Sequence, residues 1–384
     1  MQNAHLILWV SMAVLVYTYL GYPALIRLWS ALQPGARNLT RKASTPSVTF
    51  VVVAYNEAER IRDRLENILH LDYPEGLLQI LVASDGSTDA TVANARSVRS
   101  PLVSVIEFPE RRGKAATLND IVPQARGEIV VFGDVRQRFE TDALQVIVGA
   151  FADPETGAVS GELMLKSDLH NSEIEEGMGF YWRYEKFIRR HESRVDSTVG
   201  STGAIYAIRK NLFRPIPDST ILDDVLIPMQ IARQGYRVRF EPNALAYDQT
   251  SKNAYLEFQR KLRTIAGNFQ MFYLEPWLLN PVRNRLWVQT ISHKGARLLS
   301  PVCLCAALVA NLFILREPAY RYLLIAQILF YMAAAAGHLT RRAHWSPPFL
   351  NIPYTFCLLN VATIAALFSL LHGRQRATWK KTTS

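Results

Sequence analysis

The stretch SVTFVVVAYNE, residues 47–57, decides the fold. Its apolar part is rich in β-branched side chains, and an uninterrupted run of this kind is typical of a strand buried in a parallel sheet. Three polar residues then close the stretch, namely Tyr55, Asn56 and Glu57. The stretch therefore predicts a buried strand whose carboxyl end opens into a polar loop.

The same unit of strand and helix is repeated outward from this stretch. Apolar residues at helical spacing follow it at once, within residues 56–71. Three more apolar runs have the composition of strands: LLQILVASD at 77–85, LVSVIEF at 102–108 and EIVVFGD at 128–134. Because helical segments separate these runs, we predict an α/β fold with an open, doubly wound, mostly parallel sheet.

Polar residues collect at the carboxyl ends of the predicted strands. Besides residues 55–57, the loop SDGSTD at 84–89 follows the second strand, and Asp134 follows the fourth. Turns favour Asp, Gly, Ser and Asn in any protein, so each loop taken alone has an ordinary explanation. Ligands of open α/β sheets bind at this edge, and we therefore interpret the cluster as a binding site.

The second half of the same region is less regular. We expect a strand at 157–165, an amphipathic helix at 171–193 and a short strand within 201–210. An acidic pair in ILDDV, residues 221–225, precedes a helix that ends near Gly235. A strand and then a basic amphipathic helix at 253–272 complete this region.

Hydrophobic runs flank the α/β region on both sides. The chain has 384 residues and a net charge of +10, yet four runs contain no Asp, Glu, Lys or Arg: 6–26, 298–315, 322–340 and 346–373. Each has about the length that a membrane-spanning helix needs, roughly 20 residues. The predicted partition is an anchor at 1–29, a linker at 30–46, the α/β domain at 47–275, an interfacial helix at 276–297, spanning helices at 298–373 and a basic tail at 374–384.

Positive charges near the first run predict the orientation in the membrane. Arg27, Arg37, Arg41 and Lys42 follow that run and none precedes it, which places the α/β domain in the cytoplasm. The protein is then a multi-pass protein of the inner (plasma) membrane. The basic tail conflicts with four passes under the same rule, so the side of the membrane that holds it stays open.

Several functional classes lack their sequence signals. Neither Gly-x-Gly-x-x-Gly nor a Gly-Lys-Ser/Thr phosphate loop occurs, which argues against a Rossmann dehydrogenase and a P-loop ATPase. Cys303, Cys305 and Cys357 all lie in apolar runs and show no disulfide or metal spacing. The positive charge is dispersed and no nucleic-acid motif is present, so we expect phosphate-rich ligands and lipid headgroups as partners, and no nucleic acid.

Seven motifs in order resemble one family of enzymes. They are VVVAYNE, ASDGSTDAT, RRGKAATLN, VVFGD, STGAIYAIRK, ILDDV and RKLRTIAGN, between residues 51 and 268. This series resembles the family 2 glycosyltransferases, in the membrane-bound branch of cellulose, hyaluronan and poly-N-acetylglucosamine synthases. The resemblance covers about residues 46–275 and implies a GT-A fold and a nucleotide sugar as substrate.

The resemblance also implies a donor site. The residues that match its nucleotide-binding positions are Tyr55, Asn56, Glu57, Asp85, Lys114 and Asp134. Lys114 would neutralise the diphosphate, unless it is a solvated surface lysine. Where the family has Asp-x-Asp, this chain has Asp134, Val135 and Arg136. Mg²⁺ or Mn²⁺ often uses a single protein carboxylate, so Asp134 is the expected metal ligand. Arg136 would then point at the phosphates or at solvent; alternatively, it partly replaces the charge of the metal.

The remaining motifs imply a catalytic and an acceptor side. Asp224 matches the general base, with Asp223 beside it, although helix-capping acids have the same pattern. Small residues on the acceptor side are Ser201, Thr202 and Gly203. In the Gln-x-x-Arg-Trp motif of polymerising members, Arg260 stands at glutamine, Arg263 at arginine and Thr264 at tryptophan. Arg260 and Arg263 are expected to contact the diphosphate or the acceptor, unless this basic helix lies against lipid.

The expected function is inverting transfer of a sugar, with a UDP-sugar as the expected donor, to a glycan or lipid-linked acceptor, forming a β-linkage. It would take place at the cytoplasmic face, in synthesis of envelope or extracellular polysaccharide, with export or synthase partners. The alternative is a catalytically impaired nucleotide-sensing or scaffold subunit, which Arg136 and the missing tryptophan favour. A transporter lacks support because the charged motifs lie outside the apolar runs.

Overall fold

The computed structural model describes residues 2–33, 45–166, 172–249, 254–342 and 347–373. Most of the predicted linker, residues 30–46, and all of the basic tail, residues 374–384, lie outside the described residues. The predictions for these two segments therefore stay predictions.

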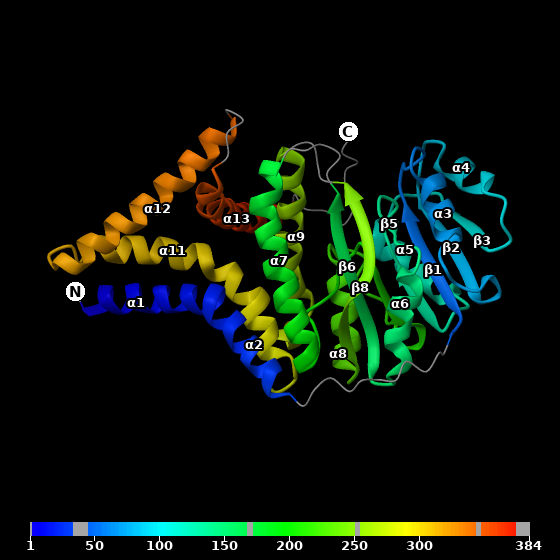
Figure 1. Ribbon diagram of the computed structural model, residues 1–384, viewed down its shortest axis with the longest axis horizontal. Helices are drawn as coiled ribbons and strands as arrows, with labels where there is room; N and C mark the ends of the chain where they lie inside the picture. The colour runs from blue at the N-terminus through cyan, green and yellow to red at the C-terminus, as the bar shows by residue number, and fades with distance from the viewer. Residues whose placement is uncertain (1, 34–44, 167–171, 250–253, 343–346, 374–384) are drawn as a thin grey trace.

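One eight-stranded sheet forms the α/β region, in the order β3-β2-β1-β4-β7-β6-β8-β5 (Figure 1). The strands are β1 (Val48–Ala54), β2 (Leu78–Asp85), β3 (Val103–Phe108), β4 (Ile129–Phe132), β5 (Arg138–Phe139), β6 (Thr156–Lys166), β7 (Tyr206–Arg209) and β8 (Arg237–Gln249). Strands β1 to β4 are mutually parallel. Strand β7 pairs antiparallel with β4 and β6, and β5 pairs antiparallel with β8, so the sheet is mixed. The predicted α/β fold is confirmed, and its parallel half carries the polar strand ends.

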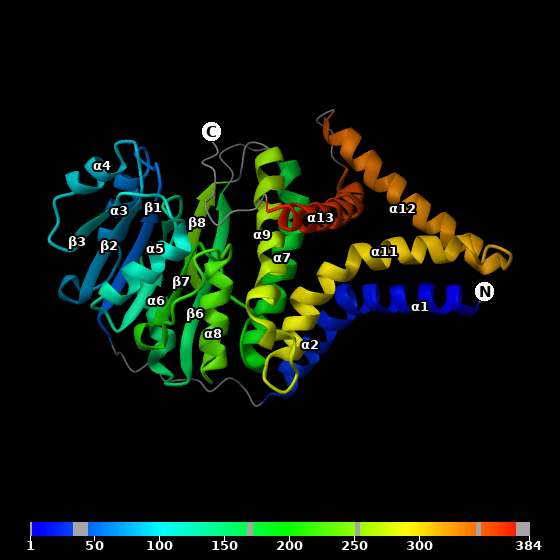
Figure 2. The same cartoon turned by 180° about the vertical axis from the view of Figure 1, so that it is seen from behind.

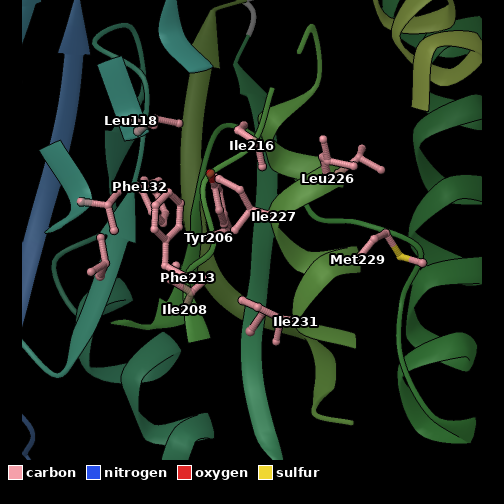
Figure 3. Close-up of a cluster of buried hydrophobic side chains, with 14 of the residues drawn as sticks. Leu118, Phe132, Tyr206, Ile208, Phe213, Ile216, Leu226, Ile227, Met229 and Ile231 are labelled. Carbon is pink, nitrogen blue, oxygen red and sulfur yellow. The ribbon is translucent and has the colours of Figure 1, made fainter. Parts of the chain in front are cut away.

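Helices cover both faces of the sheet because side chains of a strand alternate between faces. Val51 and Val53 of β1 pack on the side of α5 and α8, whereas Phe50 and Val52 pack on the side of α3 and α6. Figure 3 shows the first of these clusters, in which Phe132 and Tyr206 stack between the sheet and α8. The covering helices are α3 (Ile61–Leu69), α4 (Thr91–Ser97), α5 (Lys114–Ile121), α6 (Ala143–Gly149) and α8 (Asp223–Arg233), with short 3₁₀ turns at Glu75–Leu77, Val122–Gln124, Ala150–Ala152, Lys210–Leu212 and Pro276–Leu279.

Four helices are long and apolar enough to cross a membrane, as the sequence predicts. The candidate spans are Gln2–Leu32, Trp287–Leu312, Pro318–Thr340 and Phe349–Leu371. Their elements are α1 (Gln2–Val16), the π-helix η1 (Tyr17–Gly21), α2 (Tyr22–Leu32), α10 (Trp287–Gln289), the π-helix η7 (Thr290–Gly295), α11 (Ala296–Leu312), α12 (Pro318–Arg342) and α13 (Pro348–Leu371). Helices α1 and α11 run side by side, and α12 and α13 complete the bundle (Figures 1 and 2).

Two long helices stand between the sheet and the spans. They are α7 (Ser172–Val195) and α9 (Ala254–Leu274), at the positions where amphipathic helices are predicted. Both views show them upright between the two parts of the molecule, with α7 against α2 and α9 against α13 (Figures 1 and 2). The space between sheet and membrane helices is therefore enclosed by helices that carry charged side chains.

The structure differs from the sequence prediction around residue 297. Instead of a separate interfacial helix at 276–297, the helix that begins at Trp287 continues without a break through η7 into α11. The charged residues that suggested a boundary, Lys294 and Arg297, line a cavity inside the protein. The partition into domains itself stays a prediction.

A buried threonine holds β1 to the loop before β4. The Thr49 hydroxyl donates to Gln79 Oε1 at 2.8 Å and accepts the Gly127 backbone N–H at 2.8 Å. Thr49 is fully buried, so no water replaces it as an acceptor. This bond fixes the start of β4 and hence the register that carries Asp134 to the sheet edge.

Thr49→Val should destabilise the α/β region by about 1–3 kcal/mol, because it leaves the Gly127 N–H buried without an acceptor. Thermal unfolding of the full chain in detergent measures the effect. Thr141→Val is the matched control, since its side chain is exposed. Equal melting temperatures for the two variants would contradict this role of Thr49.

Candidate active site

One cavity of about 850 Å³ lies between the carboxyl edge of the sheet, α7, α9 and the spanning helices. Most of the residues that the sequence singled out line it. They are Lys114, Asp134, Ser201, Thr202, Gly203, Asp223, Asp224, Arg260 and Arg263. The structure therefore brings together side chains that are up to about 150 positions apart in the sequence.

Lys114 joins two carboxylates at the centre of the site. Its Nζ donates to Asp134 Oδ1 at 2.9 Å and lies 3.2 Å from Asp223 Oδ2. Only 11 % of the side chain is exposed, so Lys114 is not a solvated surface lysine. Burial disfavours the ammonium, but the charges of Asp134 and Asp223 outweigh it and raise the pKa of Lys114 above its ordinary value.

Asp134 faces the cavity as a carboxylate. Burial alone would favour the protonated acid, but Lys114 and Arg136 hold its pKa below the usual range. Arg136 lies 3.5 Å from Asp248 Oδ2 on β8, and that carboxylate also accepts from Gln137 at 3.0 Å. Arg136 therefore pairs with a side chain that lines the same cavity. The sequence predicted instead that Arg136 points at the phosphates or at solvent.

The acidic pair lies in the first turn of α8, where the helix dipole favours negative charge. Asp223 is buried and accepts from the hydroxyl of Tyr206 at 3.2 Å. Asp224 follows it, and its backbone oxygen accepts from Ser201 N at 2.8 Å and Ser201 Oγ at 2.6 Å. A Cβ at Gly203 would lie 3.2 Å from Asp224 Oδ2, so the glycine leaves the carboxylate open to the cavity.

Asp224 has the pKa of a base that works near neutrality. Burial and the neighbouring charge of Asp223 raise its pKa to about 6, against the opposing effect of Lys114. Asp134 and Asp224 therefore differ in protonation behaviour, because Lys114 contacts Asp134 but not Asp224. Such a split between neighbouring carboxyl groups is typical of catalytic acid–base sites.

Helix α9 adds cations to the same cavity. Arg263 lies within electrostatic reach of Asp134, Asp223 and Asp224, and burial lowers its pKa below the ordinary value. Arg260 and Thr264 also line the cavity, and the Lys261 ammonium lies 5.0 Å from the centroid of the Trp182 ring. The predicted basic helix therefore faces the site, and the alternative that it lies only against lipid is not what the structure shows.

The first loop of the sheet edge does not line this cavity. The Arg111 guanidinium lies 3.7 Å from the centroid of the Tyr55 ring. Asn56 has a positive φ of 53° and accepts the Thr88 N–H at 2.8 Å, while Glu57 pairs with Arg60 at 3.3 Å. Tyr55, Asn56 and Glu57 thus lie after β1, outside the lining of the cavity, and their role in nucleotide binding stays a prediction.

Asp85 holds the loop that precedes Lys114. Its two carboxylate oxygens accept the backbone N–H groups of Arg112 at 2.8 Å and Gly113 at 2.9 Å. Gly113 has a φ of 98°, a left-handed conformation that favours glycine. Asp85 is buried and does not line the cavity, and its role in nucleotide binding stays a prediction.

The residues present fit a divalent cation that also binds phosphate. Asp134 Oδ2 has no hydrogen bond within the described residues, although Oδ1 is paired with Lys114. No group of three or more His, Cys, Asp or Glu side chains that could hold a metal occurs within the described part of the chain. Asp134 would therefore hold such a cation together with oxygen atoms from a ligand.

Sequence reasoning missed three residues that shape the site. Tyr206 contacts Asp223, and Asp248 contacts Arg136. Both residues lie on strands, where a single polar side chain forms no recognisable motif. Arg64 of α3 is fully buried, lies 4.3 Å from the Phe139 ring centroid and interacts electrostatically with Asp134. Burial lowers the pKa of Arg64 to about 9. Its only sequence signal is a charged residue on the apolar face of a helix.

Comparison with known proteins gives a consistent family. Residues 49–215 match the model of Glycosyl transferase family 2. The poly-beta-1,6-N-acetyl-D-glucosamine synthase of Staphylococcus aureus (strain COL) is 26% identical over 208 residues, which are 52% of this chain and 49% of that protein. The corresponding synthase of Staphylococcus epidermidis is 24% identical over 238 residues, 60% of this chain and 56% of that protein. The matched segment thus spans about half the length of these relatives.

A solved structure matches almost the whole chain. The mannosyltransferase PcManGT from Pyrobaculum calidifontis, in complex with GDP-Man and Mn²⁺, has a TM-score of 0.70 and 25% sequence identity. The match covers 96% of this chain and 99% of that one, membrane helices included. It confirms the GT-A fold that the sequence predicts. Residues 49–215 are therefore similar to a family 2 glycosyltransferase domain, in a chain whose GT-A sheet stands against four candidate membrane spans.

Proposed function

We propose that this protein transfers a sugar from a nucleotide-sugar donor to a hydroxyl acceptor with inversion, at the cytoplasmic face of a membrane. The observation that carries the proposal is the convergence of Lys114, Asp134, Asp223 and Asp224 on one cavity. A diphosphate, an anomeric carbon and a base must meet in such a reaction, and these charges provide a place for each of them.

The donor diphosphate is assigned to the side of Asp134 and Lys114. Lys114 and Arg263 supply positive charge, and both are buried enough for that charge to act strongly on phosphate oxygens. Asp134 would hold Mg²⁺ or Mn²⁺, which when bound stabilises the negative charge of the departing nucleoside diphosphate. PcManGT, which was solved with GDP-Man and Mn²⁺, supports this assignment.

Asp224 is assigned the role of general base. Its carboxylate takes the proton of the acceptor hydroxyl while the oxygen attacks the anomeric carbon from the face opposite the diphosphate. A single base without a covalent intermediate inverts the anomeric centre, so an α-linked donor gives a β-linked product. Asp223 is held by Lys114 and Tyr206, which keeps it in place to raise the pKa of Asp224.

The nucleoside is assigned to the loops at the ends of β1 and β2. The ring of Tyr55 with Arg111 offers a surface for a planar base, and Asn56 and Glu57 border it. Asp85 would contact the base or ribose only by giving up a bond to Arg112 or Gly113, so we propose that it mainly positions this loop.

The acceptor and the cellular role follow from the relatives and from the cavity. The staphylococcal relatives are named as polysaccharide synthases, which favours synthesis of an envelope or extracellular polysaccharide, with export or synthase partners. Thr264 replaces the aromatic platform of polymerising members, which favours a small number of additions. The pairing of Arg136 with Asp248 leaves Asp134 open to the cavity, so the geometry does not favour the impaired scaffold subunit.

Asp224→Asn should lower the transfer rate by about 10²–10⁴-fold, because a neutral amide does not accept the acceptor proton. The purified chain is incubated in detergent with a panel of nucleotide sugars, and mass spectrometry identifies the product. Donor affinity should stay close to wild type. Asp63→Asn, at an exposed position of α3, is the matched control.

The same base sets the pH profile. Asp224 works only when ionised, and its pKa is raised to about 6, so the rate should be constant above this pH and fall about tenfold per pH unit below it. Transfer by Asp224→Asn near the wild-type rate, or a wild-type rate that stays constant well below the pKa, would remove Asp224 from the role.

Mn²⁺ should bind tightly only when a nucleoside diphosphate is present, because Asp134 alone offers too few ligands. Electron paramagnetic resonance of free Mn²⁺ measures binding with and without UDP or GDP, and EDTA should abolish transfer. Asp134→Asn should lose the nucleotide-dependent binding. Stoichiometric tight binding without nucleotide would contradict this arrangement, and transfer that survives EDTA would instead favour Arg136 as a replacement for the metal.

Asp85→Ala should expose the backbone of residues 110–114 to faster hydrogen exchange, because two charge-assisted hydrogen bonds are lost. The Michaelis constant for the donor should rise at the same time, since Lys114 loses its fixed position. Asp85→Asn keeps one acceptor oxygen and should give an intermediate effect. Unchanged exchange in the alanine variant would show that Asp85 does not hold this loop.

A further inference from the structure

Two cations on the membrane side of the cavity stand without a direct partner. Arg189 of α7 and Lys294 of η7 line the same cavity as Asp224. Within the described residues, neither forms a hydrogen bond or an ion pair. Lys294 lies in a π-helical segment, a kind of local insertion that is frequent at functional sites.

Two acids of α7, Glu185 and Glu192, already contact other groups. Glu185 contacts His293 Nε2 at 3.0 Å and also pairs with Arg297. Glu192 contacts His293 Nδ1 at 2.9 Å and accepts from the Tyr22 hydroxyl at 2.5 Å. Although burial favours the protonated acid, Arg297 and His293 hold the pKa of Glu185 well below its ordinary value. Glu185 and Glu192 also attract Lys294 at longer range, but among the described residues no carboxylate forms an ion pair with Arg189 or Lys294.

Three cations, Arg189, Lys294 and Arg297, thus face the carboxylates of Glu185 and Glu192 on this side of the cavity. Glu185 and Glu192 attract Lys294 while Arg189 and Arg297 repel it, and Arg189 also acts electrostatically on Asp224. Like charges in a half-buried place repel each other unless an anion lies between them. An anion bound between Arg189 and Lys294 would relieve this repulsion.

The wall next to these cations is apolar and belongs to the membrane helices. Leu20 of η1 and Phe356 and Leu359 of α13 line the cavity on this side. The cavity thus runs from the carboxylates, past the two cations, to side chains of candidate spans. An amphipathic ligand would place its charged group at the cations and its hydrocarbon chain against these helices.

We propose that Arg189 and Lys294 bind the phosphate of a lipid acceptor, whose headgroup hydroxyl then reaches Asp224. This proposal rests on the proposed function and names its acceptor class. The presence of the base Asp224 indicates which atom of the headgroup reacts. A phosphate oxygen is already a nucleophile and needs no base, whereas a hydroxyl oxygen needs one. The acceptor therefore carries both a phosphate ester and a hydroxylated headgroup, as phosphatidyl polyols and polyisoprenyl diphosphate sugars do.

The transfer step balances with the groups already assigned. The hydroxyl oxygen of the lipid headgroup forms a bond to the anomeric carbon of the donor, and its proton goes to Asp224. The bond between that carbon and the diphosphate oxygen breaks, and the nucleoside diphosphate leaves with the electron pair. The lipid phosphate is unchanged, so Arg189 and Lys294 position the acceptor and take no part in the bond exchange.

Two measurements test the proposal. Native mass spectrometry in detergent measures retention of phosphatidylglycerol, of a polyisoprenyl diphosphate sugar and of an alkyl glucoside, which has hydroxyl groups but no phosphate. Transfer assays at about pH 8, where Asp224 is ionised, use the same three acceptors. We expect phosphate-bearing lipids alone to be retained and glycosylated, and the preferred lipid distinguishes the two sources.

The variants Arg189→Gln and Lys294→Gln should each raise the Michaelis constant for the acceptor by about 10-fold or more. Donor affinity should stay close to wild type. Lys294→Arg should restore acceptor binding, and Arg190→Gln, at an exposed position of α7, is the matched control.

The outcomes separate the two proposals. A wild-type chain that neither transfers nor hydrolyses any nucleotide sugar contradicts the proposed function, while lipid retention still tests the subsite. Equal retention of the alkyl glucoside, unchanged acceptor constants in both glutamine variants, or preferred transfer to a soluble oligosaccharide would overturn the lipid phosphate subsite.

Discussion

The ammonium of Lys114 between Asp134 and Asp223 is the interaction on which the centre of the molecule depends. Without it, three carboxylates would share one partly buried place, and each pair of like charges at about 4 Å costs roughly 4 kcal/mol at an effective dielectric of 20. Lys114 compensates two of the acids directly and leaves the third, Asp224, with a raised pKa. Lys114 therefore stabilises the acid cluster. It also keeps Asp134 ionised as a ligand while Asp224 keeps the raised pKa of a base, and this arrangement exists before a substrate binds.

The sheet and its loops fix the position of that ammonium. Parallel pairing of β1 with β2 and β4 brings Asp85 and Asp134 to one edge, and Asp85 holds the Arg112 and Gly113 backbone from which α5 and Lys114 begin. On the other side, the 201–203 segment is tied to Asp224 through Ser201. Mutations far from the cavity that shift this edge should therefore act on the charges of the site, and not only on stability.

Much of this arrangement could be predicted from sequence, because strand periodicity and helix spacing are local signals. The strands ending at Tyr55, Asp85 and Asp134, the acidic start of α8 and the four apolar helices follow from them, and the family resemblance adds the joint position of Asp134 and the acidic pair in one site. Contacts between distant segments could not be predicted in this way. Arg136 pairs with Asp248, Arg189 of α7 acts electrostatically on Lys294, and Asp85 accepts the backbone N–H groups of residues 112 and 113; each contact depends on packing that joins residues with no common motif. The lining of an internal cavity by Lys294 and Arg297 could not be predicted for a related reason, since charge in a sequence does not distinguish a membrane surface from a cavity.

The central claim is that Lys114, Asp134 and Asp224 form one diphosphate-dependent site next to the membrane helices. An experimental structure of the full chain in lipid, with a nucleoside diphosphate and Mn²⁺, tests it most directly, because anomalous scattering locates the metal without assumptions about the protein. The account predicts Mn²⁺ on Asp134, phosphate oxygens at Lys114, and Asp224 facing the open side of the diphosphate. A nucleotide bound away from this cavity, or Mn²⁺ held by other residues, would contradict it.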